Sequence, residues 1–481
     1  MFFIFSAISY AIGIALIIFV IMQKKEPTAT LAWIFVIVAL PIVGVIFYLW
    51  FGYSRIERRI HKRQKSNQEI ERQLGNIENT LTEYEILSED SFDTMVQKEL
   101  SQVTKGIDGF SITHGNSFKL ITEPAEVFSR IEEAIENAKD SIHMEYYIFR
   151  RDKTGKRIRD LLIKAAKRGV EVRLLTDGVG SWTIGDVFIL PLLQAGAKFA
   201  RYLPVTFLGR PWHWNLRNHR KIAIFDGTLG MIGSINIGNE YRFRTGGEHD
   251  YYDTQIICKG PVVQQLQEVF ASDWFFATKE NLLESDRYFP LPERSGSETG
   301  QIADSGPDDP RYTLHEMICA AIHAAEHSVK ITTPYFIPDQ ALIVAMRTAA
   351  LRGVKVEVML AHHFPSLHER LFFFAARSYY EDLLSYGIKI YEHTPGFLHE
   401  KSVTVDSAWA SIGTANMDTR SFQLNFEVNV NFYSKETVKK LDDHFNENID
   451  HCKEIDLEKF KKRPLIEQGA ENVMRLFSPI L

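Results

Sequence analysis

One stretch of the chain occurs twice and carries residue types suited to chemistry at a phosphate. Both copies read H-x-K-x-x-x-x-D, and in both a G-[ST]-x-N segment follows after six more residues. A single short match would be weak, but two matches with the same extension indicate a functional site. The repeated positions are His219, Lys221, Asp226, Ser234 and Asn236 in the first copy and His399, Lys401, Asp406, Thr414 and Asn416 in the second.

The spacing of His and Lys predicts that both side chains project from one face of a β-strand, because alternate residues of a strand share a face. The apolar run 222–225 supports a strand in the first copy. If the two copies pack face to face, two imidazoles, two ammonium groups and two Asn amides converge. Cations and polar donors would then surround the oxygens of a phosphate, with an imidazole on each side of phosphorus. We predict that Ser234, Thr414, Asn236 and Asn416 help to bind it.

Two imidazoles at one phosphorus indicate covalent catalysis. One neutral ring can attack phosphorus and form a phosphohistidine, while the other, protonated, donates a proton to the leaving alkoxide. The second ring then accepts a proton from the incoming alcohol or water, so the two histidines should titrate as a coupled pair. The lysines supply positive charge, so the sequence predicts neither a metal nor another cofactor.

Carboxylates are also expected in the site, since a catalytic imidazole is usually held through its second nitrogen. Glu427 lies eleven residues after Asn416 and suits the second copy, and Asp253 is its counterpart in the first. Asp226 and Asp406 belong to the predicted catalytic set by position. A structural role for them, such as fixing a turn, is equally compatible with the pattern.

Composition excludes some functions. The net charge of −6 and the pI near 6.3 argue against a protein that coats nucleic acid, so no nucleic-acid partner is predicted. The three cysteines are scattered and form no C-x-x-C pair, which indicates neither a disulfide framework nor a zinc site.

The N-terminal part predicts a membrane anchor. Residues 2–22 and 31–51 are almost entirely apolar, and each run is long enough to cross a hydrocarbon core of about 30 Å as a helix. The link between them is too short for a domain, so they form a hairpin or one of them is re-entrant. Basic residues are denser after the second run than in the link, which predicts that the rest of the chain lies in the cytoplasm.

The remainder predicts an α/β fold with a duplicated domain. Strand, helix and strand are expected at 141–149, 158–168 and 170–175, and again at 329–337, 342–352 and 354–359. Each copy should be a mixed or mostly parallel sheet flanked by helices. The expected divisions are two transmembrane or re-entrant helices (1–54), a basic juxtamembrane and helical linker (55–110), a first domain (111–285), an exposed linker (286–310), a second domain (311–460) and a C-terminal tail (461–481), either packed or in contact with a membrane surface.

The duplicated H-x-K-x-x-x-x-D motif resembles the mark of the phospholipase D superfamily. Longer strings, such as N-H-R-K-I at Asn218 and P-G-F-L-H-E-K at Pro395, are similar to the bacterial cardiolipin synthases. The resemblance implies two tandem phospholipase D-like domains related by a pseudo-twofold axis in a bacterial plasma-membrane enzyme. It further implies that two phosphatidylglycerol molecules become cardiolipin and glycerol, with His219 as nucleophile and His399 as acid and then base. It does not specify an oligomeric state.

Three other functions fit the same residues less well. A phospholipase D or a phosphatidylserine synthase-type transferase would use the same site with another acceptor. A nuclease is disfavoured by the acidic balance and the apolar N-terminal runs. A lipid-binding scaffold without activity is disfavoured because both motifs are intact.

Overall fold

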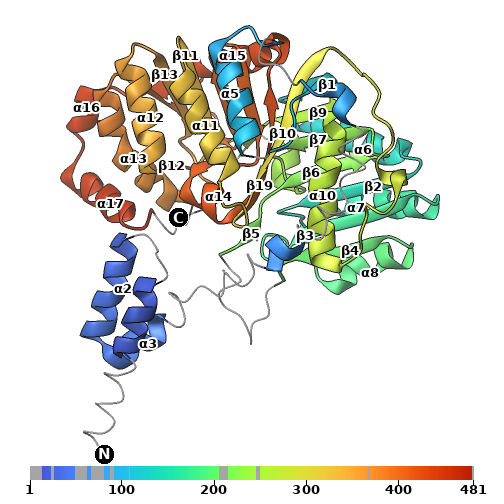
Figure 1. Ribbon diagram of the computed structural model, residues 1–481, viewed down its shortest axis with the longest axis horizontal. Helices are drawn as coiled ribbons and strands as arrows, with labels where there is room; N and C mark the ends of the chain where they lie inside the picture. Colours follow the sequence, from blue (N-terminus) through green and yellow to red (C-terminus); the bar gives the residue numbers. More distant parts are fainter. Residues whose placement is uncertain are drawn as a thin grey trace, which may run out of the picture. The chain divides into compact units, whose positions relative to one another are not determined.

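The computed structural model describes residues 13–22, 27–48, 62–66, 81–86, 91–107, 109–204, 215–244, 247, 250–366 and 369–478 (Figure 1). The chain divides into two compact units. Unit 1 comprises Met1–Arg63 with Thr206–Trp214, and unit 2 comprises Gln64–Val205 with Asn215–Leu481. Both repeated motifs therefore belong to one compact unit.

Unit 1 is helical where it is described. Residues 13–22 form a helix, followed by α2 (Pro27–Ala39) and α3 (Pro41–Phe47). The helix breaks at Leu40 because a proline disfavours the helical conformation in the residue before it. Val20, Ile37 and Tyr48 form a small buried core. Within the described ranges, no helix is both long and apolar enough to span a bilayer; the predicted spans also include residues 2–12 and 49–51, which lie outside those ranges.

Unit 2 is built on one long sheet whose strand order repeats outward from its centre. At the centre β1 (Thr113–Ile121) pairs antiparallel with β10 (Glu298–Ser305). From β1 outward lie β9 (Gln255–Lys259), β7 (Leu229–Gly233), β6 (Lys221–Phe225), β2 (Ser141–Tyr146), β3 (Glu171–Asp177) and β4 (Lys198–Tyr202). From β10 outward lie β19 (Asn425–Phe432), β17 (Trp409–Gly413), β16 (Ser402–Val405), β11 (Ser328–Thr333), β13 (Lys355–Ala361), β14 (Lys389–His393) and β20 (Cys452–Glu454). Corresponding strands of the two copies thus occupy corresponding places, as a pseudo-twofold repeat requires.

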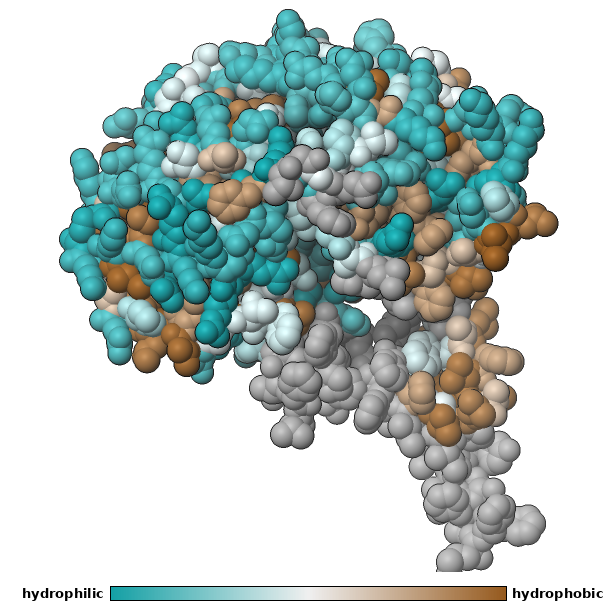
Figure 2. All heavy atoms as spheres, turned by 180° about the vertical axis from the view of Figure 1, so that it is seen from behind, coloured by the Kyte–Doolittle hydropathy of each residue, from teal (hydrophilic) through white to brown (hydrophobic). Residues whose placement is uncertain are grey.

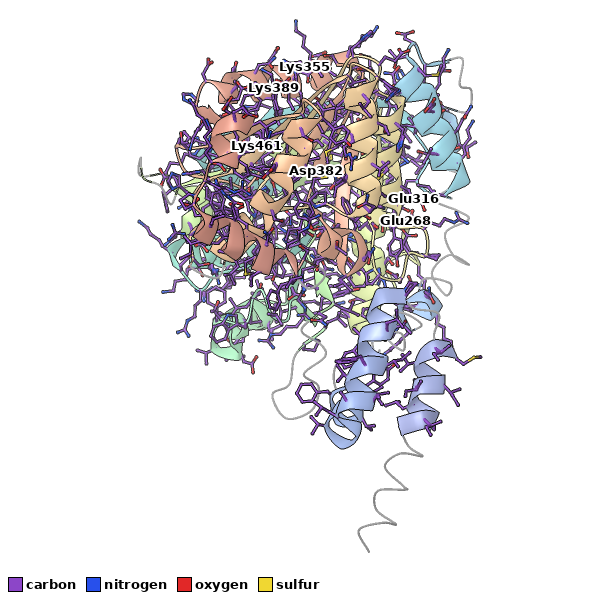
Figure 3. All side chains as sticks on the ribbon, turned by 90° about the vertical axis from the view of Figure 1, so that its left-hand side faces the viewer. Glu268, Glu316, Lys355, Asp382, Lys389 and Lys461 are labelled. Atoms are coloured by element: carbon purple, nitrogen blue, oxygen red, sulfur yellow. The ribbon has the colours of Figure 1, made fainter. Side chains whose placement is uncertain are left out.

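The sheet is mixed. The predicted strand–helix–strand units form its parallel parts, β2-β3-β4 and β11-β13-β14, while the strands between them are antiparallel. In Figure 3, Lys355 and Lys389 lie close together because they begin two neighbouring parallel strands. The helices α7 (Lys153–Lys167) and α12 (Gln340–Leu351) connect the first pair of parallel strands in each copy.

The structure differs from the prediction between the two copies. The passage 286–310 was expected to be an exposed linker, but it contains the central strand β10, with Ile302 and Ala303 buried. Its polar residues have partners inside the protein, since the Gln301 side chain donates to the Phe110 carbonyl. The two halves are therefore joined edge to edge in one sheet.

Helices cover the sheet and fill the cores of the two halves (Figure 1). In the first half these are α6 (Pro124–Asn137), α8 (Asp186–Gln194), α9 (Asn239–Arg242) and α10 (Val262–Thr278). In the second half they are α11 (Thr313–Ala324), α13 (Arg370–Ser385), α14 (Thr419–Gln423), α15 (Lys435–Ile449), α16 (Leu457–Lys461) and α17 (Leu465–Arg475). The predicted linker 55–110 contributes α5 (Met95–Gly106), whose Val96 and Leu100 pack into the core of the second half.

Candidate active site

The two motif histidines, His219 and His399, lie where each half of unit 2 extends into the other. His219 follows β5 (Arg217–Asn218), which pairs with the start of β19, and the His219 amide donates to the Phe426 carbonyl at 2.9 Å. His399 follows β15 (Phe397–Leu398), which pairs with β8 (Tyr251–Tyr252), and the His399 amide donates to the Tyr252 carbonyl at 2.7 Å. Each two-residue strand thus carries its histidine across the boundary between the halves.

Both imidazoles are held by a carboxylate from the opposite half. His219 Nδ1 lies 2.9 Å from Glu427 Oε2, and His399 Nδ1 lies 2.7 Å from Asp253 Oδ2. We expected Glu427 and Asp253 each to hold the histidine of its own half. Instead, β5 and β15 each pair with a strand of the opposite half, so each carboxylate contacts the histidine of the other half. Because an ionised carboxylate only accepts hydrogen bonds, each Nδ1 carries the proton, and Nε2 of a neutral ring keeps its lone pair.

The hydroxyls of the G-[ST]-x-N segments support these carboxylates. The buried Ser234 hydroxyl donates to Asp253. Thr414 Oγ1 accepts from the Val428 amide at 2.9 Å, and a hydrogen bond from this hydroxyl is among the interactions that lower the pKa of Glu427. Both residues were expected to bind phosphate; in the structure Ser234 contacts Asp253, and Thr414 contacts Val428, the residue after Glu427.

The two Asn residues differ from one another. Asn236 Oδ1 accepts from the Ile148 amide at 3.0 Å, which ties the loop after β7 to the end of β2. Asn416 is also buried, but its Oδ1 has no hydrogen-bond partner within the described ranges. A buried amide oxygen without a hydrogen bond costs free energy, so a bound ligand that donates a hydrogen bond to Asn416 Oδ1 would be stabilised there.

The lysines are buried beside their histidines. Lys221 Nζ donates to the His219 carbonyl at 2.6 Å, and Lys401 Nζ donates to the His399 carbonyl at 2.5 Å. Burial lowers the pKa of Lys221 to about 7 and that of Lys401 to about 8. The charge of Lys401 also lowers the pKa of Lys221, so the two motifs share one electrostatic environment.

The histidines are neutral near pH 7. Burial lowers the pKa of His219 to about 4 and that of His399 to about 3. Burial alone would raise the pKa of Glu427 and Asp253, but the adjacent histidines and lysines hold both below their ordinary values. The site therefore combines two ionised carboxylates, two neutral imidazoles and two ammonium groups that titrate near neutrality.

Asp226 and Asp406 lie away from this cluster. Asp226 accepts from the amides of Lys139, Asp140 and Ser141, at the start of β2. Asp406 makes the corresponding three bonds to the amides of residues 326–328, at the start of β11. Lys221 is the first residue of β6 and Asp226 directly follows its last residue, so about 15 Å of strand lies between them. Of the two roles that the sequence allowed, this position supports the structural one.

Sequence reasoning missed two residues beside His219. The Tyr147 ring lies with its centroid 4.9 Å from that of the imidazole, and Lys221 Nζ lies 5.4 Å from the Tyr147 centroid. Arg220 is buried, with Nε donating to the Glu427 carbonyl at 3.1 Å and Nη1 to Asp273 at 2.7 Å. The available signal was the middle position of the motif, where Arg220 in the first copy corresponds to Glu400 in the second.

Comparison with known proteins identifies the family of this chain. The family model described as "Cardiolipin synthase, PLD-like domain" matches residues 131–274 and 318–449, which contain both motifs. The chain belongs to the cardiolipin synthase family. A second model, "Phospholipase_D-nuclease N-terminal", matches residues 11–52.

Individual relatives cover nearly the whole chain. The cardiolipin synthase of Geobacillus sp. (strain WCH70) is 36% identical over 479 residues, covering 98% of this chain and 92% of the relative. Cardiolipin synthase 2 of Bacillus anthracis is 38% identical over 470 residues, covering 96% and 88%. The crystal structure of phosphatidylserine synthase from Haemophilus influenzae Rd KW20 superimposes with a TM-score of 0.61 at 14% identity, covering 80% of this chain and 100% of that one, so it shares the fold.

Proposed function

We propose that this chain is a phosphatidyltransferase that converts two phosphatidylglycerol molecules into cardiolipin and glycerol. The observation that carries the proposal is the crossed pair of histidines, each held by a carboxylate of the other half beside a buried lysine. Family membership supports the same reaction. The catalytic groups in this proposal are His219, Lys221, His399 and Lys401.

In the first step His219 Nε2 attacks the phosphorus of one phosphatidylglycerol. The bond from phosphorus to the glycerol headgroup oxygen breaks, and His399 donates the proton that this oxygen needs to leave as glycerol. His399 is neutral in the free site, so it must gain a proton as the substrate binds. The negative phosphodiester favours this, because an anion raises the pKa of an adjacent imidazole.

In the second step the headgroup hydroxyl of another phosphatidylglycerol attacks the phosphatidyl-His219 intermediate. His399, now neutral, accepts the hydroxyl proton, and His219 leaves as a neutral ring. One phosphodiester replaces another, so the reaction needs no nucleotide and is reversible. Lys221 and Lys401 stabilise the charge on the phosphoryl oxygens in both steps. Asn416 Oδ1, which has no partner among the described residues, can accept a hydrogen bond from a headgroup hydroxyl of the substrate.

Membrane attachment through unit 1 belongs to the same proposal. The exposed side chains of its described helices are largely apolar, among them Ile14, Leu31, Phe35 and Val43. Because α2 is only 13 residues long and turns into α3 at Leu40, a re-entrant or kinked second segment suits the sequence better than one straight helix. The basic residues after 51 support a multi-pass anchor with unit 2 on the cytoplasmic side.

A product assay tests the reaction. The purified full-length chain with phosphatidylglycerol as the sole lipid should form cardiolipin and glycerol in equal amounts. Phosphatidic acid as the main product would indicate a hydrolase instead, and product formed only after addition of serine would indicate a phosphatidylserine synthase. His219→Ala and His399→Ala should each abolish turnover.

An activated substrate distinguishes the roles of the two histidines. A phosphatidyl ester of p-nitrophenol has a leaving group that needs no proton, so His399→Ala should still release about one equivalent of nitrophenol and retain a phosphatidyl group on His219. His219→Ala should release none. An adduct on His399 in the His219→Ala variant would reverse the assignment.

A further inference from the structure

The C-terminal helix α17 packs on unit 2 with its charged side. Glu471 is 1% exposed and accepts from Arg377 Nε at 2.9 Å and from Arg463 Nε at 2.8 Å. The opposite face is apolar and exposed: Leu465 and Ile466 are each 83% exposed and Leu476 is 78% exposed. A surface helix of a globular domain normally buries its apolar face and exposes its charged face. In α17 the charged residue Glu471 is buried and the apolar face is exposed.

The ion pairs hold the helix in this orientation. Arg377 also donates to Glu392 at 3.2 Å, and Arg463 donates to Glu381 at 3.2 Å, so Glu471 belongs to a network that reaches α13 and β14. Rotating α17 to bury its leucines would break the buried pairs of Glu471, which is strongly unfavourable. The apolar face is thus presented outward by the fold itself.

The charges around this face indicate what covers it. Exposed basic residues stand at both ends of α17, namely Lys459, Lys461, Lys462 and Arg475. Figure 3 looks onto the second half and labels Lys461 there. An apolar helical face bordered by lysine and arginine is the pattern of a helix lying in the surface of an anionic bilayer. A protein partner would not require that border.

A second apolar surface lies on the other half. Trp182, Val187, Leu190 and Leu193, in α8 and the loop before it, are exposed. In Figure 1, α8 and α17 both lie along the lower edge of unit 2, with β5, which leads into His219, between them. Figure 2 shows hydrophobic side chains at both ends of that edge, seen from behind. Both surfaces therefore lie along the edge of unit 2 near β5, the strand that immediately precedes His219.

We propose that α17 lies in the surface of an anionic bilayer, with its apolar face among the acyl chains and its lysines at the headgroups, and that α8 is a second contact. Unit 2 would then rest on the membrane with its active-site edge toward the lipid. This goes beyond the proposed reaction, because it concerns how unit 2 meets the bilayer independently of unit 1 and of catalysis.

A site-specific probe tests this in the full-length chain, because unit 1 is itself proposed to attach to the membrane and whole-protein binding to vesicles would not distinguish the two. We would replace Cys319 and Cys452 with serine, introduce Ile466→Cys, and attach an environment-sensitive fluorophore. Leu291→Cys, at a residue that is 79% exposed in unit 2, is the matched control. In vesicles of phosphatidylcholine with phosphatidylglycerol, the probe at 466 should shift to the blue and be quenched by spin-labelled acyl chains, and the probe at 291 should not.

Other occupants of the face give different results. If a second copy or the helices of unit 1 cover α17, the probe at 466 will be shielded in detergent as well as in vesicles, and acyl-chain quenchers will have no effect. Equal quenching at 466 and 291 would also overturn the proposal. Lys461→Glu combined with Lys462→Glu should reduce the effect of phosphatidylglycerol content on the quenching at 466.

Kinetics provide a second readout. Leu465→Glu with Ile466→Glu should raise KM for long-chain phosphatidylglycerol in vesicles by about fivefold or more, because charged side chains are costly among acyl chains. The kcat with short-chain substrate in micelles should stay unchanged. Leu351→Glu, at a site 72% exposed on α12, is the control and should change neither value. An unchanged KM in the double variant would argue against docking through α17.

Discussion

The Nδ1 atom of His219 lies 2.9 Å from Oε2 of Glu427, a residue 208 positions away in the other half of the chain. The matching bond between His399 and Asp253 spans 146 positions at 2.7 Å. Each half therefore supplies one imidazole to the site and also the carboxylate that contacts the other half's imidazole. Neither half holds a complete set alone, so the proposed reaction requires both halves joined in one sheet.

Removing either carboxylate charge should greatly slow the reaction. In Glu427→Gln the side chain no longer favours the proton on Nδ1 of His219, and Asp253→Asn has the same effect on His399. We expect kcat to fall by about 10³-fold or more in each case, while the circular dichroism spectrum stays unchanged. Cardiolipin formation at saturating phosphatidylglycerol measures this. If Glu427→Gln kept more than about a tenth of the wild-type kcat, the orienting role would be wrong.

Asp226→Asn should affect stability more than catalysis. The carboxylate accepts from three backbone amides at the start of β2, and an Asn amide can replace only part of this while still tolerating the left-handed backbone there, where φ is 53°. We expect a loss of about 1–2 kcal/mol of folding free energy and a kcat within about threefold of the wild type. Thermal unfolding and the lipid assay at a temperature well below Tm separate these effects. A loss of kcat comparable to that in Glu427→Gln would place Asp226 in the catalytic set.

The low pKa values of Lys221 and Lys401 predict that activity falls at alkaline pH. Their pKa values of about 7 and 8 are lowered by burial, so in the free enzyme both lose charge as pH rises through this range. Since phosphate binding needs the ammonium form, kcat/KM should begin to fall near pH 7, where Lys221 loses its charge, and should fall further above about pH 8. The bound phosphodiester anion favours the charged lysines, so the fall in kcat should occur at higher pH than the fall in kcat/KM. A flat kcat/KM profile up to pH 10 would contradict this.

Arg220 should be essential for the stability of the boundary between the halves. It is buried and donates to Asp273, Asp304 and the Glu427 carbonyl, so Arg220→Met removes a buried cation from a cluster of acids. We expect a loss of about 3–5 kcal/mol, measured by denaturant unfolding. Adding Asp273→Asn to Arg220→Met should restore part of the loss, because fewer negative charges then remain buried. Additive losses in the double variant would show that the two residues act independently.

Much of the site could be predicted from the sequence alone. The repeated motif identified both histidine–lysine pairs, and the apolar run 222–225 predicted the strand that is observed as β6. The prediction that each pair shares one strand is not met, because His219, His399 and Lys401 lie just outside the strands. The strand–helix–strand units at 141–175 and 329–359 were predicted because their apolar patterns report local burial. The duplicated order also predicted the two related halves.

Only the tertiary structure decided how these parts combine. The polar composition of 286–310 gave no sign of the central strand β10, because its polar side chains find partners in distant parts of the chain. The positions of Asp226 and Glu427 could not be told apart by spacing, although one binds backbone amides and the other holds His219. Local periodicity reports which face a residue occupies, whereas the partner it meets depends on strand pairing between residues about 200 positions apart. The sequence by itself therefore determined the chemical groups of the site. The pairing of β5 with β19 and of β15 with β8, each across the boundary between the halves, determined which carboxylate holds which imidazole.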